Sequence, residues 1–292
     1  MAFQFQIGGF PLVRTILLGV ALLATTSCNK LRMGYEYADW LIIYSVEDNF
    51  DLNKVQRTRL KEDVAAYFKW HRNQMLPKYA DFLTWTATGV KDGLRTAEID
   101  SGYARYQVLM RGTMQPVVDK AIIMLGGLTP VQIETWVERQ KKKNLKLRKD
   151  FSGSAEENFE HRYGKIIEEL EDWTGKLTPD QKARIKALNH TLPWNGNLWL
   201  DTREKAQDRL ADLLRKRASP AELRRFLEEF YLHPEKMRTK EYKVKYKEFE
   251  MRMRTMILII HNMLTPEQKQ HFLNQVEKLA TDFRTLSQKK KP

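Results

Sequence analysis

Apolar side chains recur every three to four residues along most of the chain. One series contains Leu60, Val64 and Phe68, and a later one contains Phe249 and Met253. This spacing places the apolar side chains on one face of an α-helix. Alternation of apolar and polar positions, which would predict β-strands, gives no persuasive run. The pattern therefore predicts an all-α fold with no sheet.

Helix boundaries follow from this periodicity together with the positions of Gly, Pro and capping residues. We expect helices over residues 35–48, 53–88, 96–125, 130–174, 179–190, 199–217, 220–231, 235–263 and 266–286. Pro77 and Pro116 should kink the second and third of these, because proline removes one hydrogen bond of the helical ladder. The helix over 130–174 should weaken near residues 152–154. Long kinked helices of this kind are expected to pack as antiparallel hairpins.

The expected helices form one helical domain over residues 35–286. The 292-residue chain is long enough for one large or two modest domains. A weak seam is expected near residues 152–156 or 192–198. Residues 28–34 are predicted to form a short tether, and residues 287–292 a disordered basic tail.

The residues before Cys28 have the pattern of an export signal. Arg14 is their only charged residue, and an apolar run extends from Ile16 to Ala24. A cation, about ten apolar residues and a small-residue exit describe a secretory signal peptide, here residues 1–27. The run is shorter than the ~20 apolar residues that span a bilayer. The alternative, a buried N-terminal helix, explains neither the lack of acidic residues nor the position of the cysteine.

Cys28 is the only cysteine of the chain, and its position resembles the lipid-attachment site of bacterial lipoproteins. Thr25 stands where that site usually has Leu. The resemblance implies cleavage before Cys28 and a diacylglycerol joined to its sulfur, so the mature protein would be held by two or three acyl chains such as palmitate. Asn29 in the next position implies sorting to the outer membrane, facing the periplasm.

A short motif, Leu-Thr-Pro-x-Gln, occurs three times. Its leucine, threonine and glutamine positions are Leu128, Thr129 and Gln132, then Leu177, Thr178 and Gln181, then Leu264, Thr265 and Gln268. A relative, Leu-Asn-Lys-Val-Gln, occupies residues 52–56. Thr and Asn cap helix N-termini, Pro suits the first helical position, and Gln can reach back to the cap. Each copy is therefore predicted to start a helix, and the simplest interpretation is that the motifs do nothing more.

Pairs of Leu-Thr-x-x-Gln motifs resemble the hallmark of the Spy/CpxP group of periplasmic helical proteins. That resemblance implies a cradle-shaped helical fold with a basic, partly apolar face and a role as an ATP-independent chaperone or stress-sensor adaptor. The chain as a whole is similar to a family of uncharacterised bacterial lipoproteins. The matching features are Cys28, Asp39-Trp40-Leu41, Trp70-His71-Arg72 and Leu170–Trp173 ahead of residues 177–179. This second resemblance implies no established activity.

Charge suggests anionic partners. The chain has 50 Lys and Arg against 37 Asp and Glu, a net charge of +13, or 13 − 1 = +12 without Arg14. Export argues against nucleic acid, so lipid head groups or acidic and unfolded envelope proteins are the expected partners. The candidate surface comprises Lys141, Lys142, Lys143, Arg215, Lys216, Arg217, Lys243, Lys245 and Lys247. The alternative is that these charges serve solubility alone.

The sequence offers little for catalysis or cofactors. It has no His-Glu-x-x-His pair, no Gly-x-Ser-x-Gly and no P-loop, and no cysteine other than Cys28 remains for a zinc site. Acidic runs such as residues 168–172 fit a solvated helix face better than a glycosidase pair. The methionines over residues 251–263 fit a core stripe better than a copper site. We predict no catalytic residue, metal or cofactor.

Together these observations lead to a functional hypothesis. The chain is expected to be a lipid-anchored, non-enzymatic binding protein of the bacterial envelope, with a chaperone-like or stress-adaptor role on a basic, partly apolar helical surface. One alternative is a structural or assembly lipoprotein with a dedicated envelope partner. Another is an enzyme acting on peptidoglycan or lipid.

Overall fold

The computed structural model describes residues 28–289, and within this part of the chain the fold is all-α, without a strand or sheet. The prediction of fold class is confirmed. The helices are α2 (Cys28–Phe50), α3 (Lys54–Gln74), α4 (Leu76–Lys91), α5 (Thr96–Gly126), α6 (Pro130–Asp150), α7 (Ala155–Thr174), α8 (Pro179–Thr191), α9 (Gly196–Arg215), α10 (Pro220–Tyr231), the 3₁₀ turn η1 (Pro234–Lys236), α11 (Lys240–Met263) and α12 (Pro266–Gln288).

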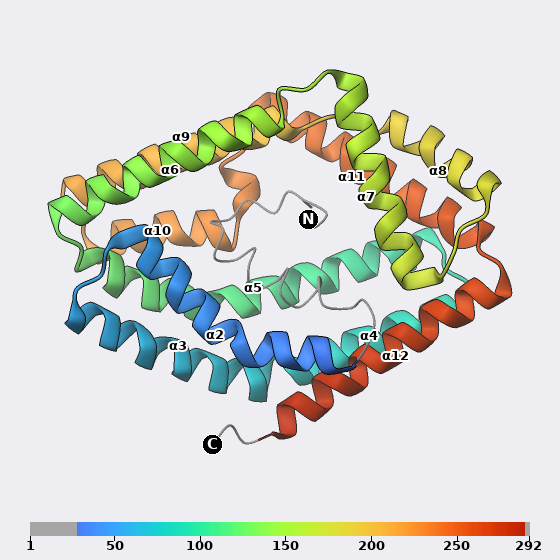
Figure 1. The fold of residues 1–292 in the computed structure, drawn as a ribbon, viewed down its shortest axis with the longest axis horizontal. Coiled ribbons are helices and arrows are strands. Elements are labelled where there is room, and N and C mark those ends of the chain that lie inside the picture. The colour runs from blue at the N-terminus through green and yellow to red at the C-terminus, as the bar shows by residue number, and fades with distance from the viewer. Residues whose placement is uncertain (1–27, 290–292) are drawn as a thin grey trace.

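The molecule is elongated, and most of its helices follow its periphery in the view of Figure 1. The pair α6 and α9 follows the upper left edge, and the pair α4 and α12 follows the lower right edge. Helices α2 and α3 lie along the lower left, and α7, α8 and α11 gather at the upper right. Ion pairs from Arg215 to Glu134 and from Arg148 to Asp201 show that α6 and α9 run antiparallel.

Two main apolar cores hold this arrangement. The larger core is formed by residues of the five helices from α2 through α6 and of α9, α10 and α12. It buries Trp136 and Phe226 completely. The second joins α7, α8 and α11 around Ile185. Met256 lies buried in this second core, so the methionine-rich segment of α11 fills apolar space as expected of flexible thioether side chains.

Three expected helices are interrupted. The helix predicted over 53–88 is divided at Met75, and α4 begins with Pro77 in its first turn, where proline needs no hydrogen-bond donor. The helix predicted over 130–174 stops at Asp150, because Ser154 caps a new helix and accepts a hydrogen bond from the Glu157 amide. The helix predicted over 235–263 begins only at Lys240, because Thr239 caps α11. Pro116, by contrast, lies inside the continuous helix α5.

The N-terminal boundary also differs from expectation. Helix α2 starts at Cys28, so residues 28–34 continue the helix instead of forming an irregular tether. Leu31, Arg32 and Met33 are good helix formers, which accounts for the extension. No described helix is long and apolar enough to cross a membrane. The predicted signal peptide, the side chain of Cys28 and the end of the basic tail lie outside the described residues.

Candidate functional site

Each copy of the Leu-Thr-Pro-x-Gln motif starts a helix with a capping box. The Thr129 hydroxyl accepts from the Gln132 amide at 3.3 Å, and the Gln132 side chain accepts from the Thr129 amide at 2.9 Å. The copies that open α8 and α12 repeat this geometry. The variant at residues 52–56 caps α3 in the same way, with Asn53 in place of threonine. All four segments therefore satisfy backbone donors that a helix start would leave unpaired.

The motifs also contact one another in two pairs. The side-chain amides of Gln56 and Gln132 exchange hydrogen bonds of 3.1 and 2.7 Å, and those of Gln181 and Gln268 exchange bonds of 2.8 and 2.9 Å. Each glutamine also donates to the carbonyl just before the leucine of its partner motif. The four acceptors are Asp51, Gly127, Lys176 and Met263. The glutamines thus join two helix starts that lie far apart in sequence.

The cationic clusters lie on α6, at the end of α9 and on α11. Arg215, near the end of α9, binds Glu134 at the start of α6 through two 2.8 Å contacts. At the opposite end of α6, Leu147 packs against a core that contains Tyr242 of α11. The cluster at residues 141–143 therefore lies on α6 itself, and the clusters at residues 215–217 and 243–247 lie on segments that pack against the two ends of α6.

Several candidate cations have intramolecular partners. Lys216 pairs with Glu222, Lys245 pairs with Glu241, and Arg217 donates to the Leu128 carbonyl at 2.6 Å. These contacts assign the three side chains a structural role beside any external one. Lys141, Lys142, Lys243 and Lys247 are exposed and form no ion pair with a carboxylate of the described residues.

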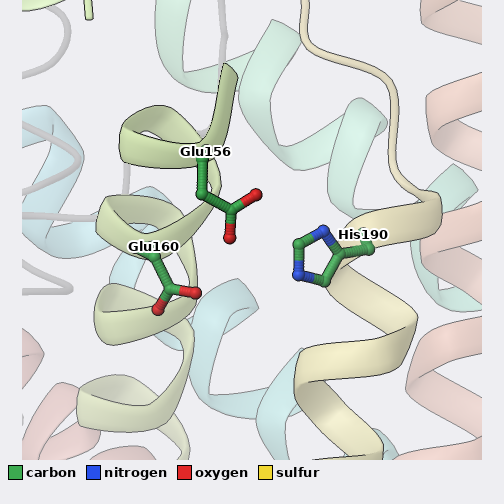
Figure 2. Close-up of side chains that lie close together, drawn as sticks. All are labelled: Glu156, Glu160 and His190. Carbon is green, nitrogen blue, oxygen red and sulfur yellow. The ribbon is translucent and has the colours of Figure 1, made fainter. Parts of the chain in front are cut away.

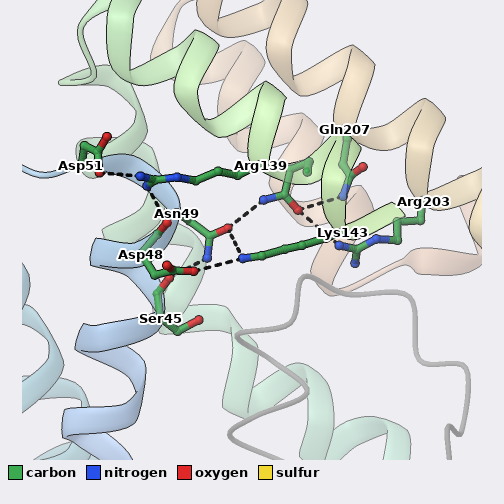
Figure 3. A network of polar contacts seen from close by, with 9 residues as sticks. Ser45, Asp48, Asn49, Asp51, Arg139, Lys143, Arg203 and Gln207 are labelled. Atoms are coloured by element: carbon green, nitrogen blue, oxygen red, sulfur yellow. Dashed lines mark hydrogen bonds and ion pairs between the residues drawn. The ribbon is translucent and has the colours of Figure 1, made fainter. Parts of the chain in front are cut away.

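Lys143 belongs to a polar network that joins α2, α6 and α9 (Figure 3). Its ammonium lies 3.3 Å from the Asp48 carboxylate and 3.0 Å from the Asn49 side-chain oxygen. The buried Gln140 amide donates to the same Asn49 oxygen at 2.7 Å, and Gln140 in turn accepts from Arg203 of α9 at 3.2 Å. Lys143 therefore helps to fix α6 between its neighbours and is a poor choice for an external contact.

A second buried network surrounds His71. The Tyr35 hydroxyl lies 2.9 Å from His71 Nδ1, and the Tyr79 hydroxyl lies 3.4 Å from Nε2, so a neutral imidazole can accept at one nitrogen and donate at the other. Burial, together with the smaller effect of the neighbouring Arg72 guanidinium, lowers the pKa of His71 to about 4. This histidine therefore stays neutral at physiological pH and links three helices.

An apolar groove lies between α3 and α5, and sequence reasoning did not anticipate it. It encloses about 310 Å³, and the core residues Val46 and Phe50 of α2 and Leu227 of α10 line its interior. Val55 and Ile123 stand on its lips with exposed fractions of 79% and 51%. Pockets of this volume and apolar character are typical ligand sites.

A comparison with known families places the chain. The model of a family of unknown function (DUF6279) matches residues 48–243. The chain belongs to this family. No curated protein and no solved structure matches it. The span shared with the family contains the first motif pair, one copy of the second and both helices that border the groove, whereas Gln268 and α12 lie beyond it.

One cluster in this family member has the composition of a metal site. The ligand atoms of Glu156, Glu160 and His190 lie within 4.8 Å of one another (Figure 2). Glu160 already lies 2.6 Å from the Lys186 ammonium, and hydrogen bonding to that group lowers the pKa of the Glu160 carboxyl. Glu156 and His190 are exposed, so the cluster has no enclosed cavity for an ion. We assign no metal to it.

The outer face of α2 carries a row of exposed aromatic and apolar side chains. Tyr37, Trp40, Leu41 and Tyr44 follow the three- and four-residue spacing of one helix face, and Trp40 stacks on Tyr44 at 5.6 Å between ring centroids. Tyr35 of the same helix is buried, so the aromatic side chains of α2 are divided between an inner and an outer face. The row begins nine residues after Cys28, since 37 − 28 = 9.

Proposed function

We propose that this protein is a lipid-anchored, non-enzymatic binding protein of the bacterial envelope that captures acidic or unfolded polypeptide segments reversibly. The observation that supports it most directly is the outer face of α6. There the exposed Leu145 shares one helix face with Lys141, Lys142 and Lys149. A basic surface interrupted by apolar side chains can attract an acidic segment and then hold it by contact.

Attraction and contact act over different distances. Charges on α6 and α11 raise the local concentration of anionic chains, and this effect weakens with salt because the Debye length falls to about 8 Å at physiological ionic strength. Leu145 and the similarly exposed Val244 of α11 then supply apolar contact at short range. Weak contacts of this kind permit release without an energy source.

The proposed anchor is supported by the position of α2. The predicted export signal and lipidation of Cys28 would place acyl chains at the start of this helix, and the exposed aromatic row begins about two and a half turns later. Tyr and Trp favour the interface between lipid and water. The paired motifs add the resemblance to Spy/CpxP proteins, which fits a chaperone-like or stress-adaptor role at the periplasmic face of the outer membrane.

The test follows aggregation of a reduced, unfolding model protein by light scattering, with purified protein at low and high salt. We expect suppression near equimolar ratio and a weaker effect at high salt. The double variant Lys141→Ala/Lys142→Ala should need roughly threefold more protein for the same suppression, because each exposed charge contributes about 0.2–1 kcal/mol. Lys69→Ala/Lys78→Ala removes the same charge from exposed positions on α3 and α4 and should behave as the parent.

A lack of suppression at every ratio would reject general capture. A single cross-linked envelope protein in that case would favour the alternative of an assembly lipoprotein with one dedicated partner. Turnover of peptidoglycan or lipid, lost when one carboxylate is neutralised in a folded variant, would instead support an enzyme.

A further inference from the structure

The groove between α3 and α5 is elongated along α3. Its α3 wall extends from Val55 to Tyr67, which corresponds to about 18 Å of helix rise. Its interior is formed by aliphatic and aromatic side chains of the main core, and the exposed Val55 and Ile123 keep it open to solvent. An elongated apolar ligand would therefore cover apolar side chains that the protein itself leaves open to solvent.

Polar groups in the groove are few and already engaged. The Gln56 side chain exchanges bonds with Gln132 and donates to the Gly127 carbonyl, and the Tyr67 hydroxyl donates to the Thr113 carbonyl at 3.3 Å. A polypeptide strand in the groove would bury backbone N–H and C=O groups without partners, and each such group would weaken binding by roughly fivefold to a hundredfold. An alkyl chain has no such groups, so this lining favours an alkyl chain over a peptide.

Charged side chains occupy one edge of the groove. Lys120 of α5 lies 2.7 Å from the Asp63 carboxylate of α3, and Arg59 lies 3.7 Å from the same carboxylate. Asp63 balances one of the two cations, so the edge keeps one net positive charge. Both cations are about half exposed and can reach a ligand that carries a single negative charge.

We propose that the groove binds a single-chain anionic amphiphile, a long-chain fatty acid, with its alkyl chain between α3 and α5 and its carboxylate at Arg59 and Lys120. Each buried methylene strengthens binding about fourfold, so the alkyl chain supplies most of the affinity. The carboxylate fixes the direction of the chain. This site is separate from the basic face of α6, so it can bind fatty acid whether or not that face captures polypeptides.

The experiment measures binding of palmitate to the purified protein by calorimetry, below the concentration at which palmitate aggregates. We expect saturable binding of one palmitate per chain. Ala121→Phe places a phenyl ring in the groove and should weaken binding at least about tenfold, because it excludes several methylenes. Val55→Ser/Ile123→Ser changes only exposed lip residues, so it tests the same site without threatening the core, and it should also weaken binding.

The charged edge is tested with Arg59→Ala/Lys120→Ala. This variant should bind palmitate about three- to tenfold more weakly and should bind the neutral hexadecanol as the parent does. Lys142→Ala on α6 is the matched control and should leave palmitate binding unchanged. The proposal is overturned if palmitate shows no saturable binding, or if both groove variants bind it like the parent. An apolar peptide that binds in the groove where palmitate does not would also overturn it.

Discussion

His71 shows how one buried side chain can make stability depend on pH. Above pH 6.5 the histidine is neutral in both the folded and the unfolded chain. Between pH 6.5 and about 4 the unfolded chain takes up a proton that the folded chain excludes, so the free energy of unfolding falls as the pH falls. The full difference of pKa corresponds to about 3 kcal/mol.

Urea unfolding at several pH values between 4 and 7 measures this contribution. His71→Gln removes the titrating group, so its stability should depend less steeply on pH than that of the parent. His261 is a second histidine whose pKa is lowered by burial, and it adds to the slope in both proteins. The contribution of His71 is therefore the difference between the parent and His71→Gln in how steeply the free energy of unfolding changes with pH. Parallel curves for parent and variant would show that His71 does not titrate in this window.

The glutamines of the motifs show what single residues reveal in sequence and what they hide. Thr129 and Gln132 predict a capping box because all of its atoms lie within one helical turn. Their pairing with another motif could not be predicted, because Gln56 and Gln132 are separated by 76 positions and Gln181 and Gln268 by 87. The related segment at residues 52–56 has Asn53 in place of threonine. Its Gln56 nevertheless makes the same contacts between motifs as the glutamines of the full copies.

At the scale of elements, helix ends follow local chemistry. The sequence predicted where α8, α10 and α12 begin because Thr or Ser precedes Pro at each start. It marked the break between α3 and α4 only as a kink at Pro77, and the break between α6 and α7 only as a weakening near residues 152–154, because the helical periodicity resumes after each. The groove could not be predicted for a different reason. In the sequence, Val46, Leu60 and Leu227 have the pattern of ordinary core positions, and only the way their helices pack leaves a groove between them.

The end of α7 depends on a glycine. Gly175 has φ 78° and ψ −175°, a conformation that residues with a side chain rarely adopt. Gly175→Ala should therefore lower the free energy of unfolding by about 1–3 kcal/mol. Gly164 provides the control, because it lies inside α7 and an added methyl group would meet no atom within 4 Å.

Gly164→Ala should raise stability by roughly 0.5–1 kcal/mol, because alanine restricts the unfolded chain more than glycine does. Thermal and urea unfolding of both variants measure the two effects on the same helix. Equal stability of Gly175→Ala and the parent would mean that the backbone at this position relaxes to a conformation open to alanine.

At the scale of the whole molecule, the two motif pairs present different surfaces. The residue before the glutamine is Val55 or Val131 in the first pair, and both side chains are exposed. The same position holds Asp180 or Glu267 in the second pair. In Figure 1 the starts of α3 and α6, which carry the exposed valines, lie at one end of the molecule, and α2 reaches that end only with its last residues; the acidic pair lies at the other end, where α8 and α12 begin.

The exposed aromatic row of α2 agrees with the proposed anchor. From Cys28, the exposed Tyr37 lies about 13 Å and Tyr44 about 24 Å along α2, given 1.5 Å of rise per residue. A helix that starts at the lipid anchor and lies along the bilayer can place Tyr37, Trp40 and Tyr44 together at the interface. The body of the protein would then hold a defined orientation on the membrane.

The aromatic row can be tested apart from the acyl chains. In unacylated protein carrying Cys28→Ser, the triple change Tyr37→Ser/Trp40→Ser/Tyr44→Ser should weaken co-sedimentation with neutral phosphatidylcholine vesicles by roughly tenfold, because three interfacial aromatic contacts are lost. Val131→Ser/Val244→Ser removes equally exposed apolar side chains from α6 and α11 and should bind vesicles as the Cys28→Ser parent does. Neutral vesicles exclude attraction between head-group charge and the basic clusters, so a loss confined to the triple variant would assign membrane contact to α2. Equal binding by all three proteins would show that the aromatic row of α2 makes no contact with the bilayer.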